Sequence, residues 1–117
     1  MKTLQWVGSS KKDLKGLPED IKIMFGFALY QAQIGKKHED AKPLKGFGSA
    51  GVLEIVESDE DGTYRGVYTV RFSKAVYVLH CFQKKSMHGI KTATQDINLI
   101  KSRLKLAETH AKENGYE

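Results

Sequence analysis

The most regular apolar pattern in the chain lies between residues 21 and 32, where apolar side chains recur every three or four positions. Its members are Ile21, Met24, Phe25, Ala28, Leu29 and Ala32. In an α-helix this spacing places all six on one face. Pro18 precedes the run, where the first helical turn tolerates a missing N–H, and Gly35 follows it. The pattern predicts a long helix that buries this face.

A second helical pattern occupies the end of the chain. Its apolar members are Ile97, Ile100, Leu104, Ala107 and Ala111. Either Thr92 or Thr94 is expected to cap its start, and residues 112–117 are expected to fray. A short polar helix is expected over residues 9–15, ended by Gly16.

Strand patterns fill most of the remaining chain. Residues 52–57, 63–72 and 75–82 are rich in β-branched and aromatic side chains and are separated by short links, which predicts an antiparallel meander. Residues 3–7 form a weaker first strand, and residues 37–51 are expected to form a loop. The order of strand, two helices, three strands and a helix predicts a single α+β domain spanning residues 1–117.

Strand alternation assigns side chains to the two faces of this sheet. One face of residues 63–72 is expected to be core, and it holds Tyr64, Gly66, Tyr68, Val70 and Phe72. The opposite face holds Arg65, Val67, Thr69 and Arg71. In the next strand, strict alternation separates Val76, Val78, His80 and Phe82 from Tyr77, Leu79, Cys81 and Gln83.

The positive charge of the chain is concentrated in its second half. Residues 1–61 hold nine lysines and ten acidic residues, whereas residues 62–117 hold ten lysines and arginines and four acidic residues. Residues 62–95 include six basic residues and no acidic one. Such a field attracts polyanions, most often phosphate backbones. A solvated basic surface is the alternative.

Composition excludes several classes of protein. No apolar stretch approaches the roughly 20 residues of a membrane span, and the start of the chain lacks the apolar segment of a secretory signal. The single cysteine, Cys81, allows no internal disulfide and is expected to be a small buried side chain. These features favour a cytoplasmic protein without a membrane partner.

Two strand residues are candidates for chemistry. A strand holds the side chain of Arg65 in a fixed direction, which suits bidentate binding of a phosphate. An ion pair with Glu54 would explain an arginine at this position equally well. Arg71, about 20 Å away at the usual strand rise, is more simply explained by a carboxylate partner. His80 is more simply structural, although imidazole also transfers protons near neutral pH.

The segment that leaves the last strand is the most suggestive for function. It brings Lys84, Lys85, a hydroxyl and His88 into a loop held by a sheet, which is a usual place for functional groups. A solubilising loop is the alternative. The sequence holds no glycine-rich phosphate loop, HExxH or CxxC motif, so we expect no metal or other cofactor.

Several segments together resemble a known family. They are Lys42-Pro43-Leu44-Lys45-Gly46, Val52-Leu53-Glu54-Ile55, Thr63-Tyr64-Arg65-Gly66-Val67-Tyr68, Val76-Tyr77-Val78-Leu79-His80-Cys81-Phe82-Gln83-Lys84-Lys85-Ser86, and residues 95–104. Over about residues 20–107 the chain is similar to the phage-derived HigB-like branch of the RelE/ParE toxin superfamily. The Tyr-Arg-x-x-Tyr strand joined to Leu-His-x-Phe-x-Lys-Lys is the specific combination.

This resemblance implies a compact RelE-like fold, with helices on one side of a curved antiparallel sheet. It implies the toxin of a type II toxin–antitoxin system, which cleaves mRNA on the ribosome without metal and is restrained by a cognate helix-turn-helix antitoxin. In such toxins the 2′-OH of the RNA attacks the adjacent phosphate.

The resemblance also implies roles for individual residues. Arg65 would bind the scissile phosphate, Lys84 and Lys85 would contact phosphate, and His88 is the nearby candidate acid. Glu54 is expected to pair with a basic residue. Further RNA contacts are expected from Lys45, Arg71 and Lys91. The chain departs from the family at Val56, where many relatives have arginine, and at Ala93, where many have proline.

Two other functions fit the residues. The absent arginine at Val56 favours a non-enzymatic binder, either a ParE-like target poison or a relic that only binds its antitoxin. A plain nucleic-acid-binding module is the third interpretation, weakened because single-strand binders need exposed aromatic stacking platforms. We expect Arg65→Ala or Lys84→Ala to relieve toxicity and leave the fold intact.

Overall fold

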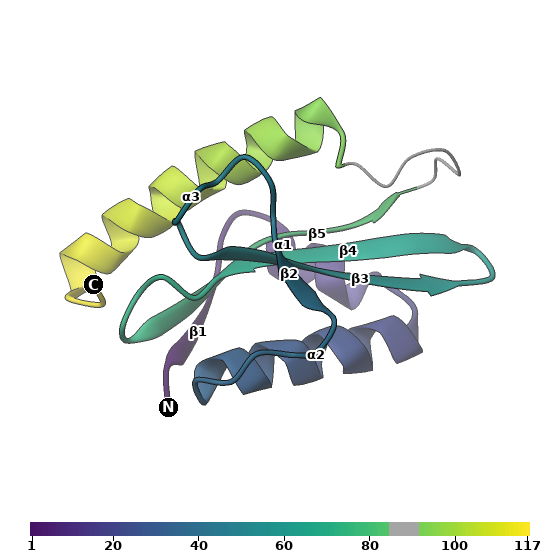
Figure 1. The fold of residues 1–117 in the computed structure, drawn as a ribbon, viewed down its shortest axis with the longest axis horizontal. Coiled ribbons are helices and arrows are strands. Elements are labelled where there is room, and N and C mark those ends of the chain that lie inside the picture. The colour runs from purple at the N-terminus through teal and green to yellow at the C-terminus, as the bar shows by residue number, and fades with distance from the viewer. Residues whose placement is uncertain (85–91) are drawn as a thin grey trace.

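The computed structural model describes residues 1–84 and 92–117 and has an α+β fold (Figure 1). The elements, in chain order, are β1 (Thr3–Trp6), α1 (Ser10–Lys15), α2 (Glu19–Gln33), β2 (Ala41–Pro43), β3 (Val52–Asp59), β4 (Gly62–Thr69), β5 (Ala75–Lys84) and α3 (Thr94–Asn114). The predicted α+β class is confirmed.

The strands form one sheet in the order β1-β5-β4-β3-β2. The expected antiparallel meander of β3, β4 and β5 is present. The sheet is nevertheless mixed, because β1 pairs with β5 in parallel. The expected loop also contains an edge strand, β2, which pairs with β3 and holds Pro43. An edge tolerates proline because an outward N–H has no partner to lose.

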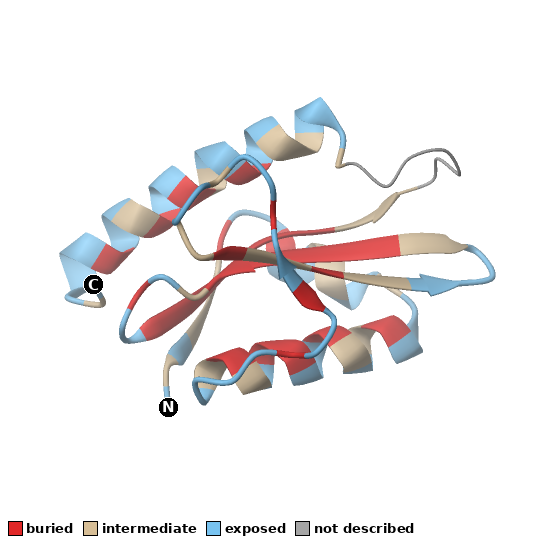
Figure 2. Ribbon diagram, in the orientation of Figure 1, coloured by how far each residue is buried: buried red, intermediate tan, exposed pale blue. Residues whose placement is uncertain are grey.

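Helices cover both faces of the sheet, not one (Figure 1). The inner face of α2 packs on one side, where Phe25 and Leu29 meet Ile55 and Tyr68. On the other side α3 packs through its apolar stripe, and Ile100 lies against Leu79. Figure 2 shows the buried sheet between these two helices. Both predicted helical faces are therefore confirmed, but they bury opposite sides of the sheet.

A β-bulge in β5 changes the predicted assignment of faces. Val67 pairs with His80 and Tyr68 pairs with Val78, which leaves Leu79 as an extra residue in β5. Beyond the bulge the alternation is inverted. His80 and Phe82 therefore join the face that α3 covers, and Cys81 belongs to the core beneath α2. Strict alternation was therefore wrong for residues 80–83.

The two ends of α3 also differ from expectation. Ala93 occupies the N-cap without a side-chain hydrogen bond, so neither threonine caps the helix. The helix continues to Asn114 and ends at Gly115, which adopts a left-handed conformation with φ of 68°. The carbonyl of Tyr116 then accepts hydrogen bonds from the Lys74 N–H and the Ser73 hydroxyl. These bonds tie down the end of the chain that was expected to fray.

Candidate functional site

Arg65 lies in the interior of β4, on the sheet face that α3 covers. Its side chain is only 4 % exposed, and Nη1 donates a 3.0 Å hydrogen bond to Oε2 of Glu54 on β3. The same carboxylate oxygen accepts a 3.4 Å bond from the hydroxyl of Thr92, just before α3. Arg65 and Glu54 thus form a largely desolvated ion pair, an arrangement that needs good geometry to offset the loss of hydration.

Lys84 is the last residue of β5 and shares this face with Arg65. It lies opposite Thr63, whereas Arg65 lies opposite Phe82. The two cations therefore occupy diagonal positions on adjacent strands, a relationship that separates residues by about 7–8 Å and their Cβ atoms by somewhat less. Lys84 is half-buried, and its ammonium is strongly hydrated and mobile compared with the fixed guanidinium of Arg65.

His80 and Phe82 lie next to this pair on the same strand. Nε2 of His80 is 2.8 Å from Oδ1 of Asp96, in the first turn of α3. The His80 ring also stacks on Phe82, with centroids 4.3 Å apart and planes 17° apart. Phe82 is directly opposite Arg65 on β4. The contact between His80 and Asp96 therefore links the first turn of α3 to β5.

Val56 occupies the position directly opposite Arg65 on β3. An arginine there, as in many of the toxins that the chain resembles, would place a second guanidinium on the same face. In this chain the neighbour is apolar, so the cations that the described residues place on this face, near the start of β4 and at the end of β5, are Arg65 and Lys84. Asp96, Thr92 and Phe82 were not foreseen, because each gains its place through contacts distant in sequence.

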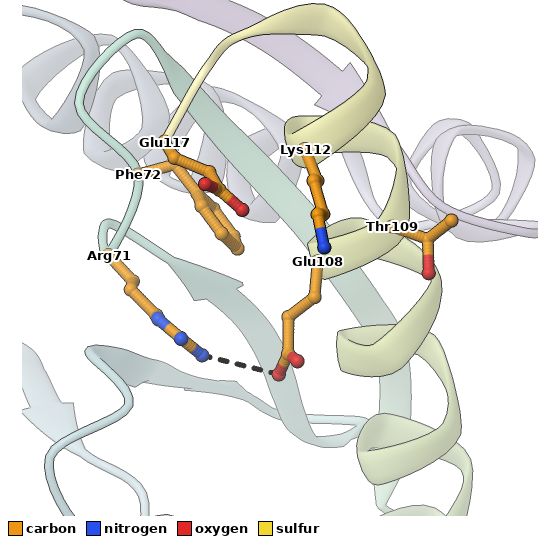
Figure 3. A pocket seen from close by; sticks show the side chains of 6 residues that line it. All are labelled: Arg71, Phe72, Glu108, Thr109, Lys112 and Glu117. Atoms are coloured by element: carbon orange, nitrogen blue, oxygen red, sulfur yellow. Dashed lines mark hydrogen bonds and ion pairs between the residues drawn. The ribbon is translucent and has the colours of Figure 1, made fainter.

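Arg71 follows the other end of β4 by two residues and does not join this group. Nη1 of Arg71 is 3.2 Å from Oε1 of Glu108, and its guanidinium lies 5.5 Å from the centre of the Phe72 ring. Both charged groups are about half exposed. They line an open hollow of about 480 Å³, which also includes Thr109, Lys112 and Glu117 (Figure 3). Its charges alternate in sign, which does not favour a polyanion.

The remaining predicted residues have separate locations. Lys45 is exposed in the segment after β2, whose neighbours Leu44 and Phe47 pack into the core beneath α3. Lys85, His88 and Lys91 lie outside the described residues. The structure therefore brings together four of the predicted residues, and these are Glu54, Arg65, His80 and Lys84. We call this group, with Phe82 and Asp96, the sheet-end cluster.

Residues 1–84 and 92–117 offer neither a metal site nor a membrane-spanning helix. Within these ranges, no group of three or more histidine, cysteine, aspartate or glutamate side chains could hold a metal ion. Nor is any helix there both long enough and apolar enough to cross a membrane. Cys81 is buried, and burial raises the pKa of its thiol to about 12, which makes it a poor nucleophile.

Comparison with known proteins places the chain in a family. A search of curated proteins gave no match. A family model described as "Phage derived protein Gp49-like (DUF891)" matches residues 12–105. The matched region runs from α1 to the middle of α3 and includes the described sheet-end cluster. This family is associated with RelE-like toxins. The chain therefore belongs to the Gp49-like family of phage-derived proteins.

Proposed function

We propose that this protein is the toxin of a type II toxin–antitoxin system, of the HigB-like kind, and that it cleaves mRNA on the ribosome. Membership of a toxin-like family supports the first part of the proposal. The excess of basic residues after position 61 supports an RNA target. The proposed partners are the ribosome-bound message and a helix-turn-helix antitoxin.

The position of Arg65 and Lys84 carries the proposal of cleavage. They lie diagonally on one face, on adjacent strands, and Glu54 and His80 flank them. A phosphate at the ends of β4 and β5 would contact Lys84 first, since its side chain is the more exposed. Arg65 would reach the same phosphate by exchanging part of its pairing with Glu54 for the substrate anion.

The reaction that fits these groups needs no metal. The 2′ oxygen of one nucleotide attacks the adjacent phosphorus and loses its proton, and the bond from phosphorus to the 5′ oxygen breaks. The products are a 2′,3′-cyclic phosphate and a 5′ hydroxyl, which gains a proton. Fixed cations stabilise the charge that accumulates on the phosphate, and electrostatic stabilisation of this kind is usually the largest catalytic contribution. His88 remains the predicted acid, outside the described residues.

Inducible expression with and without the adjacent helix-turn-helix gene tests this function. We expect growth arrest that the neighbour relieves, with new 5′ ends mapped within translated messages. Lys84→Ala should abolish both effects, and Lys105→Ala, an exposed lysine on α3, is the matched control. Arrest with intact messages would exclude cleavage, and growth without arrest would exclude a toxin.

A second function is favoured by the burial of Arg65. With 4 % of its side chain exposed and Glu54 bonded to it, Arg65 presents little positive charge to an incoming RNA. A non-enzymatic toxin that blocks a target by contact would fit that geometry. It predicts arrest without message cleavage and little effect of Lys84→Ala, so the same experiment separates the two functions.

A further inference from the structure

The outer face of α2 carries an apolar stripe that residues 1–84 and 92–117 leave largely exposed, although the rings of Phe27 and His38 meet nearly at right angles, with centroids 5.8 Å apart. Ile23, Phe27, Tyr30 and Ile34, at spacings of four, three and four residues, are 62, 53, 49 and 40 % exposed. Ile34 is the C-cap and the others lie within the helix. Figure 2 shows this helix buried toward the sheet and exposed on the opposite side. Monomeric proteins scatter such side chains singly, and a contiguous row marks an interaction surface.

The stripe has the features of a surface for close helix packing. Residues 23–35 include no charged side chain. Gly26 lies one turn after Ile23 on the exposed side, and a Cβ built there would meet no atom within 4 Å. Glycine inside a helix is unfavourable for the helix itself, but it allows another backbone to approach. This position therefore suits a second helix crossing near the centre of the stripe.

The charges at the two ends of α2 are opposite and match a reversed copy of the same helix. Glu19 and Asp20 precede Ile23 by four and three positions, which places them on the stripe side at the start of the helix. Lys36 and Lys37 follow its other end. In an antiparallel pair, each acidic end meets the basic end of the partner. The two helix dipoles are also antiparallel, which is favourable.

We propose that the protein forms a two-fold symmetric homodimer through antiparallel contact of two α2 helices, centred near Phe27. Such an interface is isologous, so one self-complementary patch serves both subunits. The proposal is independent of cleavage, because the outer face of α2 points away from the sheet, whereas the sheet-end cluster lies on the opposite side of the sheet.

The size of the stripe fits a dimer of moderate stability. A whole aromatic side chain buries about 150–250 Å², so each half-exposed member contributes on the order of 100 Å². Two copies would therefore bury roughly 800 Å² of apolar side chain. The polar side chains around the stripe would raise the total buried area toward about 1,200 Å², the lower limit for stable interfaces. The dimer should therefore dissociate on dilution.

The mass in solution, measured against concentration by light scattering or sedimentation, tests the proposal. We expect a species of twice 13.1 kDa at high concentration. Phe27→Lys should weaken the dimer by about a hundredfold or more, because it places two charges at the centre of the interface. Leu106→Lys is the matched control, since Leu106 is 59 % exposed on α3, and it should leave the dimer unchanged.

Charge exchange tests the antiparallel arrangement. Glu19→Lys with Asp20→Lys, or Lys36→Glu with Lys37→Glu, should weaken the dimer, and combining all four changes should restore it. Circular dichroism would verify that each variant folds. A monomer at every concentration would overturn the proposal. So would a wild-type dimer that Phe27→Lys leaves intact, or a stripe protected only when the adjacent gene product is bound.

Discussion

Arg103 of α3 donates a 2.8 Å hydrogen bond from Nη1 to the carbonyl of Leu79, the extra residue of the β5 bulge. Nη2 of the same guanidinium donates a 3.0 Å bond to the hydroxyl of Ser9, which precedes α1. One side chain therefore joins the last helix, the bulge and the turn after β1. Because the bulge decides which face His80 occupies, Arg103 supports the geometry of the sheet-end cluster at a distance.

Arg103→Met should destabilise the fold while keeping most of the side chain's length. The change removes both donors and leaves the Leu79 carbonyl without this partner, which costs about 1–3 kcal/mol for a buried polar group. Lys105→Met, on an exposed position of the same helix, should change stability by less than about 0.5 kcal/mol. Urea denaturation measures both, and equal midpoints would contradict this role for Arg103.

Arg65→Ala should lower stability as well as any toxicity. Removing one member of a buried ion pair costs about 3–5 kcal/mol, because the remaining charge is left without compensation. Lys84→Ala, at a strand end, should cost less than about 0.5 kcal/mol. The structure thus revises the expectation that both substitutions spare the fold, and Lys84 becomes the cleaner test of the site.

A double-mutant cycle isolates the Arg65–Glu54 interaction. Glu54→Gln and Arg65→Gln should each destabilise, and the double variant should be more stable than the sum of the two effects by about 1 kcal/mol or more. Denaturant unfolding of the four proteins gives the coupling directly. Simple additivity would mean that the 3.0 Å contact contributes no net energy.

Helical periodicity and strand composition predicted the elements of the core because those signals are local. The buried face of α2 could be predicted from spacing alone, since all its members follow the same 3.6-residue repeat. The parallel pairing of β1 with β5 could not, because it joins residues about seventy positions apart. Edge strand β2 was missed because three residues ending in proline carry almost no strand signal.

The candidate site was harder to predict because one inserted residue inverts a strand. Alternation placed His80 with Val78, but the bulge at Leu79 turns His80 toward Asp96 instead. Nothing in the local sequence marks the bulge, which is fixed by pairing with β4 and by Arg103. The burial of Arg65 has the same origin, since Glu54 and Thr92 enclose it from two distant segments.

Gly66→Ala should destabilise the core between the sheet and α2. A Cβ at this position would lie 3.1 Å from Cδ2 of Phe25 and 3.2 Å from Cγ2 of Ile55. Overpacking of this kind costs about 1–3 kcal/mol. Gly16→Ala is the matched control, because its Cβ would make only ordinary contacts and its φ is −82°. Thermal unfolding should separate the two variants, and similar melting temperatures would refute the packing argument.

Glu57 should make the fold less stable as pH rises toward neutrality. Burial, followed by its hydrogen bond with Asp40 and the charge of Asp40, raises the pKa of Glu57 from 4.5 to about 7. Two carboxyl groups can hydrogen-bond only when one is protonated. Since the folded state holds this proton more tightly than the unfolded state, its stabilising effect is complete below pH 4.5 and is lost by about pH 7.

Glu57→Gln removes this titration because the amide stays neutral. The difference in unfolding free energy between the wild-type protein and this variant should therefore change across pH 4.5 to 7, by on the order of 1 kcal/mol after allowance for solvent screening. Asp40→Asn should keep part of the dependence, because burial, the larger cause, remains. A difference that stays constant across this range would contradict the assignment. If Asp40→Asn removes the pH dependence as completely as Glu57→Gln does, Asp40 and not burial is the main cause of the raised pKa of Glu57.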